Sequence, residues 1–150
     1  MQLSDLLTPE RIVCNLSSQS KKRTLEEISE RISSCDARVT TNEVFDSLLA
    51  RERLGGTGIG HGVAIPHGRL KNTEQTIGAF IKLDKAIDFD SLDNQPVDLI
   101  FALLVPEHST QEHLQVLASI ASMFNDEQAR EKLRHASSAE EIYQIICDWK

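Results

Sequence analysis

The chain has 150 residues, the size of one ordinary domain, and 40% of them are hydrophobic, so it can bury a core without disulfides or a metal. Its net charge of −7 argues against nucleic acid or an anionic membrane as a main partner, because both select a basic surface. The chain opens without a secretory signal, and its longest apolar run is too short to cross a bilayer. Its three cysteines share no metal-type spacing. Together these features predict one cytoplasmic domain over residues 1–150 with no membrane insertion.

The N-terminal third is predicted to be mostly helical. Residues 3–12 carry spaced leucines and are expected to form an irregular cover or a short helix, and residues 20–32 have apolar positions at helical spacing. A second helix is expected from Thr41, as its N-cap, to about Leu54, because two glycines follow. The side chains predicted to face the core are Leu25, Ile28 and Ile32 in the first helix and Val44, Leu48 and Leu49 in the second.

The middle of the chain predicts strands. Residues 63–65 form a short apolar run that stops at Pro66, and residues 76–83 place apolar side chains at alternate positions. Residues 97–105 are almost continuously apolar, as expected of a strand that is buried on both sides and ended by Pro106. The second and third of these strands are close in sequence and are expected to pair. The face predicted for the second strand is Ile77, Ala79, Ile81 and Leu83.

Three helices are predicted for the C-terminal part. Ser109 or Thr110 is expected to cap the first, and residues 127–135 and 139–149 fit two more. Helices before, between and after strands predict an α/β fold with a mixed sheet flanked by helices on both faces. The apolar face predicted for the first of the three is Leu114, Leu117, Ile120, Ala121 and Phe124.

The most unusual segment is residues 51–69, which holds six of the seven glycines. Such a loop can bring backbone N–H groups against an anion, but its spacing matches neither the P-loop nor the dinucleotide fingerprint, so ATP and NAD are not expected. Pro66 fixes the chain ahead of His67, and Gly68 leaves the imidazole uncrowded. A neutral imidazole is a good nucleophile near pH 7, although this local pattern also fits a turn histidine that only ends a strand.

A longer pattern surrounds this histidine. Glu52 is followed by six residues and then by the run Ile59-Gly60-His-Gly-Val-Ala-Ile-Pro-His67-Gly68. The pattern resembles the signature of the mannitol/fructose-type IIA phosphocarriers of the phosphotransferase system. Residues 19–23 and 89–106 are similar to the nitrogen-regulatory branch of that family rather than to its sugar-specific members. The resemblance covers most of the chain and implies a single-domain mannitol/fructose-type IIA fold.

The resemblance also implies the site residues. In that family the histidine of Pro-His-Gly accepts a phosphoryl group through Nε2, so His67 takes that role and its Nδ1–H is left to bond a backbone carbonyl. Arg51 matches the arginine that precedes the family's glycines, and its guanidinium can give two parallel hydrogen bonds to phosphoryl oxygens. His113 matches the family's second histidine, in the first turn of a helix where free N–H groups favour an anion. From residue type alone, Arg51 and His113 also fit exposed helix positions without a role.

The function that the resemblance implies is a phosphoryl carrier and regulator of the nitrogen branch. The donor is an HPr-like phosphohistidine protein, the regulated partners are cytosolic proteins such as regulators of potassium uptake, and neither a cofactor nor a metal takes part. Phosphorylation is expected to switch partner binding at a surface around His67 that is edged by Ile59 and Ile65. The sequence does not indicate the oligomeric state or the metabolic signal.

Three alternatives stay open. The first is a sugar-specific IIA component, for fructose or mannitol, that passes its phosphate to a IIB domain. The second is a binding module that never carries phosphate. The third is a metal site whose ligands would be His61, His67, His108 and His113. A metal site is disfavoured because no His-Glu-x-x-His motif occurs and the spacing of these histidines does not place them on one helical face.

Overall fold

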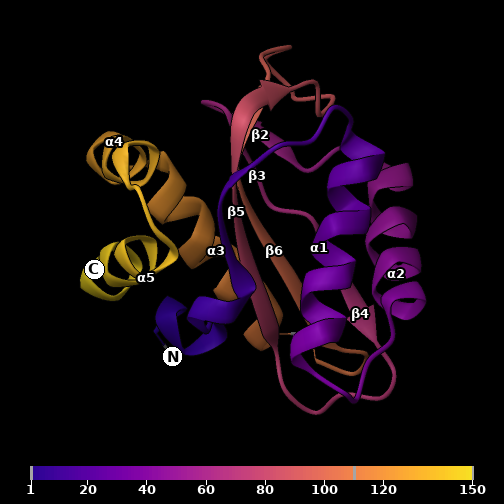
Figure 1. Cartoon of the computed structure of the whole chain (residues 1–150). Coiled ribbons are helices and arrows are strands. Elements are labelled where there is room, and N and C mark those ends of the chain that lie inside the picture. The colour runs from indigo at the N-terminus through magenta and orange to yellow at the C-terminus, as the bar shows by residue number, and fades with distance from the viewer. Residues whose placement is uncertain (1, 110, 150) are drawn as a thin grey trace.

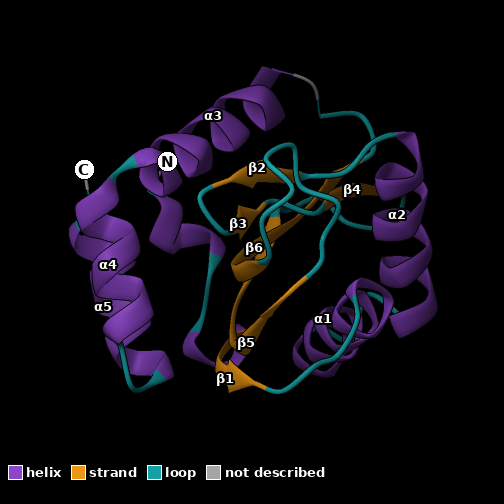
Figure 2. Cartoon of the chain, turned by 90° about the horizontal axis from the view of Figure 1, so that it is seen from above, coloured by secondary structure: helices purple, strands orange, loops and turns teal. Residues whose placement is uncertain are grey.

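A computed structural model of the chain describes residues 2–109 and 111–149, and Figure 1 shows its secondary structure. The elements in chain order are the short 3-10 helices η1 (Leu3–Leu6) and η2 (Pro9–Arg11), strand β1 (Ile12–Leu16), helices α1 (Lys21–Cys35) and α2 (Thr41–Leu54), strands β2 (Gly58–Gly60), β3 (Val63–Ala64), β4 (His67–Leu70), β5 (Ile77–Ile87) and β6 (Val97–Pro106), and helices α3 (Gln111–Asn125), α4 (Glu127–His135) and α5 (Ala139–Asp148). One sheet divides the molecule, with α1 and α2 on one face and α3, α4 and α5 on the other (Figure 2).

The sheet is mixed, as the sequence predicted. Its strand order is β1-β5-β6-β3-β2, and β4 also pairs with β6. The expected pairing of β5 with β6 is antiparallel, whereas β1 runs parallel to β5, and both β3 and β4 run parallel to β6. The central strand β6 therefore pairs directly with β3, β4 and β5, and β2 joins the sheet through β3.

Strand β6 is buried on both sides, and from Leu99 to Val105 its side chains alternate between two cores. On the face covered by α3, α4 and α5 it contributes Leu99, Phe101, Leu103 and Val105. On the face covered by α1 and α2 it contributes Val97, Ile100, Ala102 and Leu104. The predicted face of β5 is confirmed in the same way, because Ile77, Ala79, Ile81 and Leu83 all lie in the core under α1 and α2.

Helices α1 and α2 were both predicted, and the N-cap of α2 differs from the prediction by one residue. Ser20 caps α1, and its side chain accepts a hydrogen bond from Arg23 N. The N-cap of α2 is Thr40 rather than the predicted Thr41, because the hydroxyl of Thr40 is the one that accepts from Glu43 N. Both residues are threonines and adjacent, so the sequence alone did not separate them. For α3 the choice between Ser109 and Thr110 is undecided, since Thr110 lies outside the described residues.

The predicted apolar face of α3 is partly wrong. Leu114 is 65% exposed, and the buried positions are His113, Val116, Ile120, Met123 and Phe124. The buried stripe is thus rotated toward His113, a polar residue that a pattern of hydrophobic spacing does not count as interior.

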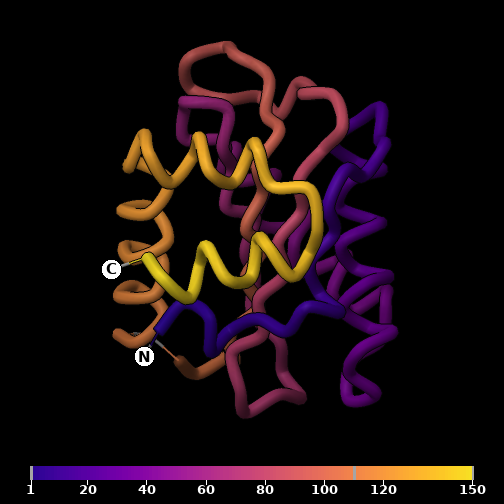
Figure 3. Tube along the Cα trace, turned by 60° about the vertical axis from the view of Figure 1, so that its left-hand side comes forward, coloured from indigo at the N-terminus to yellow at the C-terminus, as the bar shows by residue number. Residues whose placement is uncertain are grey.

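The sequence also missed three short strands. Residues 3–12 do include the short helices η1 and η2, but from Ile12 the chain is extended and β1 pairs with β5. Strands β2 and β4 are rich in glycine or charge and carry no alternating apolar signal. Figure 3 shows the N-terminal segment lying beside α5, which packs against η1, η2 and β1. No helix within residues 2–109 and 111–149 is both long and apolar enough to cross a bilayer.

Candidate functional site

His67 lies at an interruption between two strands. Both β3 and β4 pair with β6, β3 opposite residues 99–100 and β4 opposite residues 103–106. Ile65 and Pro66 separate the two strands, and the carbonyl of Pro66 still accepts a hydrogen bond from Leu103 N at 2.9 Å. His67 therefore follows β3, as predicted, but it also begins β4. The chain before His67 and the chain after it are both paired with β6, and this fixes the backbone of His67.

The imidazole of His67 is held in one tautomer. Its Nδ1 lies 2.8 Å from the carbonyl oxygen of Ile65, and because a carbonyl can only accept, Nδ1 carries the proton. This hydrogen bond to a backbone carbonyl is the one that the sequence resemblance implied. In the neutral ring the lone pair is then on Nε2.

The surroundings of His67 favour that neutral ring. Burial lowers the pKa of His67 below its usual value, and the cations Arg51 and Arg69 lower it further. The hydrogen bond to Ile65 and the carboxylate of Glu52 oppose this shift without cancelling it. At pH 7 the imidazole is therefore uncharged, the form that can act as a nucleophile.

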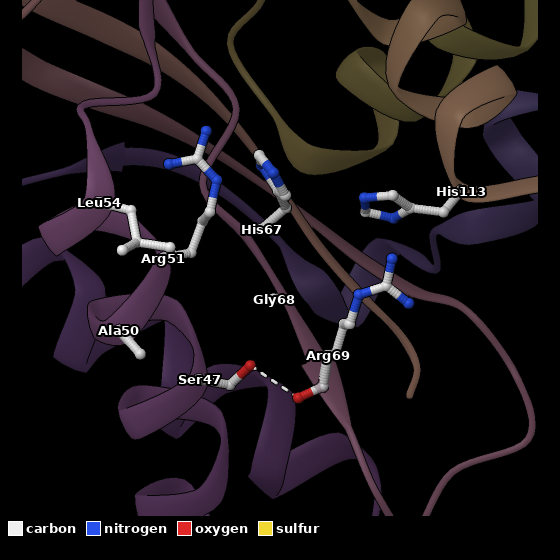
Figure 4. A pocket seen from close by; sticks show the side chains of 8 residues that line it. All are labelled: Ser47, Ala50, Arg51, Leu54, His67, Gly68, Arg69 and His113. Carbon is white, nitrogen blue, oxygen red and sulfur yellow. Dashed lines mark hydrogen bonds between the residues drawn. The ribbon is translucent and has the colours of Figure 1, made fainter. Parts of the chain in front are cut away.

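A cavity of about 500 Å³ opens in front of His67 (Figure 4). The residues that line it are Ser47, Ala50, Arg51, Leu54, His67, Gly68, Arg69 and His113. Two of these side chains are guanidinium groups, and none of the described residues that line the cavity is a carboxylate. In a protein with a net charge of −7, this is a local positive site suited to an anion.

The cavity brings together the three residues predicted for the site. Arg51 comes from the last turn of α2, where its Nη1 donates to the carbonyl of Gly55 at 2.8 Å. His113 comes from the first turn of α3, and the centroid of its ring is 5.5 Å from that of His67, with the two ring planes at 52°. Figure 4 shows Arg51 on one side of His67 and His113 on the other.

His113 is buried rather than exposed. Burial lowers its pKa, and the neighbouring His67 and Arg69 lower it further, so it too is neutral near pH 7. Its Nδ1 is enclosed and has no hydrogen-bond partner in the described part of the chain. A group bound in the cavity can therefore reach His113 only through Nε2.

Arg69 is a cavity residue that the sequence analysis did not identify. It stands two residues after His67 in β4, and side chains at that spacing lie on the same face of a strand. Its Nη1 donates to the carbonyls of Glu107, at 2.9 Å, and Ser109, so it also ties β4 to the loop that leads into α3. The alternation of β4 could have found Arg69, had that strand been predicted.

The glycine loop serves close packing rather than an anion cradle. None of residues 55–62 lines the cavity. Gly56 and Gly58 instead lie against the backbone of the loop after β5, where an added Cβ on Gly58 would overlap the hydroxyl of Ser91. The N–H groups of this loop therefore do not line the cavity in front of His67.

Gly68 lets α2 approach β4. A Cβ on Gly68 would overlap the hydroxyl of Ser47 and lie 3.0 Å from its backbone carbon and oxygen. Because an overpacked contact usually costs about 1–3 kcal/mol, Gly68→Ala should lower the free energy of unfolding by about 2 kcal/mol in urea titration. Ser47→Ala is the matched control, since it removes the 2.8 Å hydrogen bond from Ser47 to the Arg69 carbonyl and leaves the space open. Equal stability of Gly68→Ala and wild type would contradict this account.

The four histidines of the metal-site alternative do not come together. His61 borders a cavity beside Ile59 and Val63, and His108 borders another beside Glu112. Across residues 2–109 and 111–149, no group of three or more His, Cys, Asp or Glu side chains is placed to hold a metal ion.

Comparison with known proteins agrees with this fold. A family model described as "Phosphoenolpyruvate-dependent sugar phosphotransferase system, EIIA 2" matches residues 5–149. The nitrogen regulatory protein of Pseudomonas aeruginosa is 45% identical over 148 residues, which are 99% of this chain and 96% of that protein. The crystal structure of nitrogen regulatory protein IIA-Ntr from Neisseria meningitidis matches with a TM-score of 0.90 and 43% identity, over 96% of this chain and 98% of that one. IIA mannitol from Escherichia coli shares the fold, with a TM-score of 0.78 and 24% identity over 93% of this chain and 98% of that one. The chain therefore belongs to the EIIA type 2 family of the phosphoenolpyruvate-dependent sugar phosphotransferase system, within which it is similar to the nitrogen regulatory proteins.

Proposed function

We propose that this protein is a cytoplasmic phosphoryl carrier and regulator of the nitrogen branch, and that it accepts a phosphoryl group from an HPr-like phosphohistidine protein onto His67. The observation that supports this most directly is the fixed tautomer of His67. With Nδ1 bonded to the Ile65 carbonyl, the Nε2 lone pair is free beside a cavity that has two guanidinium groups in its lining. An uncharged nucleophile beside fixed cations suits an incoming phosphoryl group.

The transfer needs no cofactor or metal, because the donor phosphoramidate is already reactive. Nε2 of His67 attacks the phosphorus, the P–N bond to the donor imidazole breaks with its electron pair returning to the donor, and a new P–N bond forms. Negative charge is then spread over the three equatorial oxygens, so positioning and electrostatics dominate the catalysis. Arg51 and His113 have the roles of donors to those oxygens, Arg51 as a planar fork and His113 through Nε2.

The test is incubation with a phosphoenolpyruvate-charged HPr-like protein, followed by peptide mapping of acid-labile phosphate. We expect one equivalent of label on the peptide that contains His67. Label on His113 would reverse the roles of the two histidines, and absence of label on both would refute the carrier function.

The regulatory part of the proposal rests on the surface around the cavity. Leu54 lines it and is 86% exposed, and Leu114, next to His113, is 65% exposed. Of the two residues predicted to edge this surface, Ile65 is buried, and Ile59 is 41% exposed but lines a different cavity, beside His61 and Val63. Phosphorylation of a protein side chain adds about 1.5 to 2 negative charges, whose desolvation against an apolar partner surface would oppose binding.

The unphosphorylated form is therefore expected to bind regulated partners, such as cytosolic regulators of potassium uptake, and the phosphorylated form to release at least one of them. Affinity capture from cell extract with wild type, fully phosphorylated wild type and His67→Ala compares the three states. His67→Ala should capture what unphosphorylated wild type captures. Identical partners and affinities for all three proteins would refute the switch and favour the sugar-specific alternative. Transfer of phosphate from the phosphorylated protein to a sugar-type IIB domain tests that alternative directly.

A further inference from the structure

Two features of the sequence have no role in the proposed transfer. Glu52 is the acidic residue that opens the site signature, and Lys21 belongs to the basic run at the start of α1. The structure brings them together, with Lys21 Nζ 2.7 Å from Glu52 Oε2. We infer that this ion pair is a positioning device that holds the His67 imidazole and the turn carrying Arg51, an inference that rests on the proposed function.

A continuous set of hydrogen bonds connects Glu52 to His67. The carboxylate of Glu52 accepts from both donors of Thr57, the backbone N–H at 3.3 Å and the hydroxyl. The carbonyl of Thr57 accepts from Ile65 N at 3.1 Å, and the carbonyl of Ile65 accepts from Nδ1 of His67 at 2.8 Å. A displacement of Glu52 would therefore move the carbonyl that fixes the tautomer of the nucleophile.

Glu52 also belongs to the turn that carries Arg51, through its backbone. Glu52 is the next residue in α2, and its backbone carbonyl accepts from Gly55 N at 3.2 Å, while the carbonyl of Gly55 accepts from Arg51 Nη1. The end of α2 and the start of the glycine loop are thus linked through Glu52 by its backbone and its side chain. One residue controls the placement of both the nucleophile and its cation.

Lys21 is at a position that its own helix does not favour. It is the first residue of α1, which has no acidic residue in its first turn, and a cation at a helix N-terminus opposes the macrodipole. Its ammonium group is 3.3 Å from Asp90, whose side chain is 75% exposed, and 5.1 Å from the centroid of the Phe89 ring. The buried carboxylate of Glu52, 2% exposed, is the contact that most needs this cation, because an unpaired buried charge is costly.

Stability alone is a weak reason for such a pair. A buried ion pair can often be replaced by neutral side chains at little cost in folding free energy, whereas removal of one partner leaves the other charge unpaired. A double replacement of Glu52 by Gln and Lys21 by Met therefore separates the two roles, because it removes both charges and leaves only one of the two oxygens that accept from Thr57. If the pair only supports the fold, the double variant behaves as wild type. If it positions the site, the double variant is stable and still transfers slowly.

The experiment compares wild type, Glu52→Gln, Lys21→Met, the double variant and Lys21→Arg, with Lys22→Met as the matched control. Lys22 is the adjacent lysine of α1 and is exposed. Thermal unfolding, single-turnover transfer from the charged donor and the NMR titration of the His67 imidazole are measured for each. Because loss of positioning near a reacting centre can cost up to about a hundredfold in rate, we expect Glu52→Gln and the double variant to transfer about ten to a hundred times more slowly.

The titration gives a readout that needs no phosphate. Glu52 and the hydrogen bond to Ile65 both raise the pKa of His67, so removal of the carboxylate should move the His67 titration to lower pH. Lys21→Arg keeps the pair and should keep both the rate and the titration, as should Lys22→Met. A folded double variant with the wild-type transfer rate and the wild-type His67 titration would overturn the inference while leaving the carrier proposal intact. Failure of wild type itself to accept phosphate would count against the carrier proposal, and the titration would still decide whether Glu52 acts on His67.

Discussion

The His67→Ala protein is expected to fold and to accept no phosphoryl group from a charged HPr-like donor. The side chain of His67 makes one hydrogen bond, to the Ile65 carbonyl, whereas the backbone of β4 pairs with β6 through residues 67–70 and does not depend on the side chain. The variant therefore loses the nucleophile and little else. Circular dichroism checks the fold, and the stoichiometry of acid-labile phosphate checks the chemistry.

The matched control is His135→Ala, at the end of α4, where the imidazole is exposed and bonds only the carbonyl of Glu131. It should be phosphorylated like wild type. Stoichiometric acid-labile phosphate on His67→Ala would show that another residue accepts the group. The pKa of His67 is lowered from that of an ordinary imidazole, which is about 6.5. In wild type the rate of phosphate acceptance should therefore stay constant at pH values below about 6.5 and fall only as the pH drops through the lowered pKa of His67.

The Arg51→Lys protein is expected to accept phosphate at the same site but about a hundredfold more slowly. Lysine keeps the charge but loses the planar fork, and it cannot both hold the Gly55 carbonyl and give two parallel bonds to a phosphoryl group. Removal of one oxyanion donor in other enzymes costs on the order of 3 kcal/mol, which corresponds to about a hundredfold in rate. Rapid-quench measurement of a single turnover gives the comparison.

Arg53→Lys is the control for this variant, because Arg53 lies on the same helix, is exposed and does not line the cavity. A similar decrease in both variants would point to donor docking rather than to the transferring group. An unchanged single-turnover rate for Arg51→Lys would show that Arg51 has no part in the transfer.

The layered fold was predictable because its signals are local and periodic. Helices α1, α2, α4 and α5 and strand β5 have apolar residues at the spacing of their own secondary structure, β6 is a continuous apolar run, and each lies within a few residues of its expected bounds. The short strands β1, β2 and β4 were not predictable in this way. They exist because other strands offer them backbone hydrogen bonds. The partners of β1 and β4 are far away in the sequence, and the partner of β2 is the two-residue strand β3 just after it.

The residues of the candidate site differ in the same way in how far the sequence predicted them. His67 was identifiable from Pro66 and Gly68 and from the family signature, all within a few residues. Arg69 depended on a strand that had no signal, and the burial of His113 depended on the rotation of α3 against the sheet. The ion pair of Lys21 with Glu52 joins two residues that lie on different helices, and no local periodicity encodes it. What the sequence did not predict is in each case a contact between elements.

The alternation of β6 between two cores has a consequence for how the site is lost. Arg51 is attached to the layer of α1 and α2, and His113 to the layer of α3, α4 and α5, so the cavity exists only while both layers are docked on the same strand. Since every second side chain of β6 belongs to the opposite core, opening of one layer exposes half of that strand and weakens its hold on β4. The candidate site therefore depends on both layers at once, and partial opening that spares most helices would already take the cavity apart.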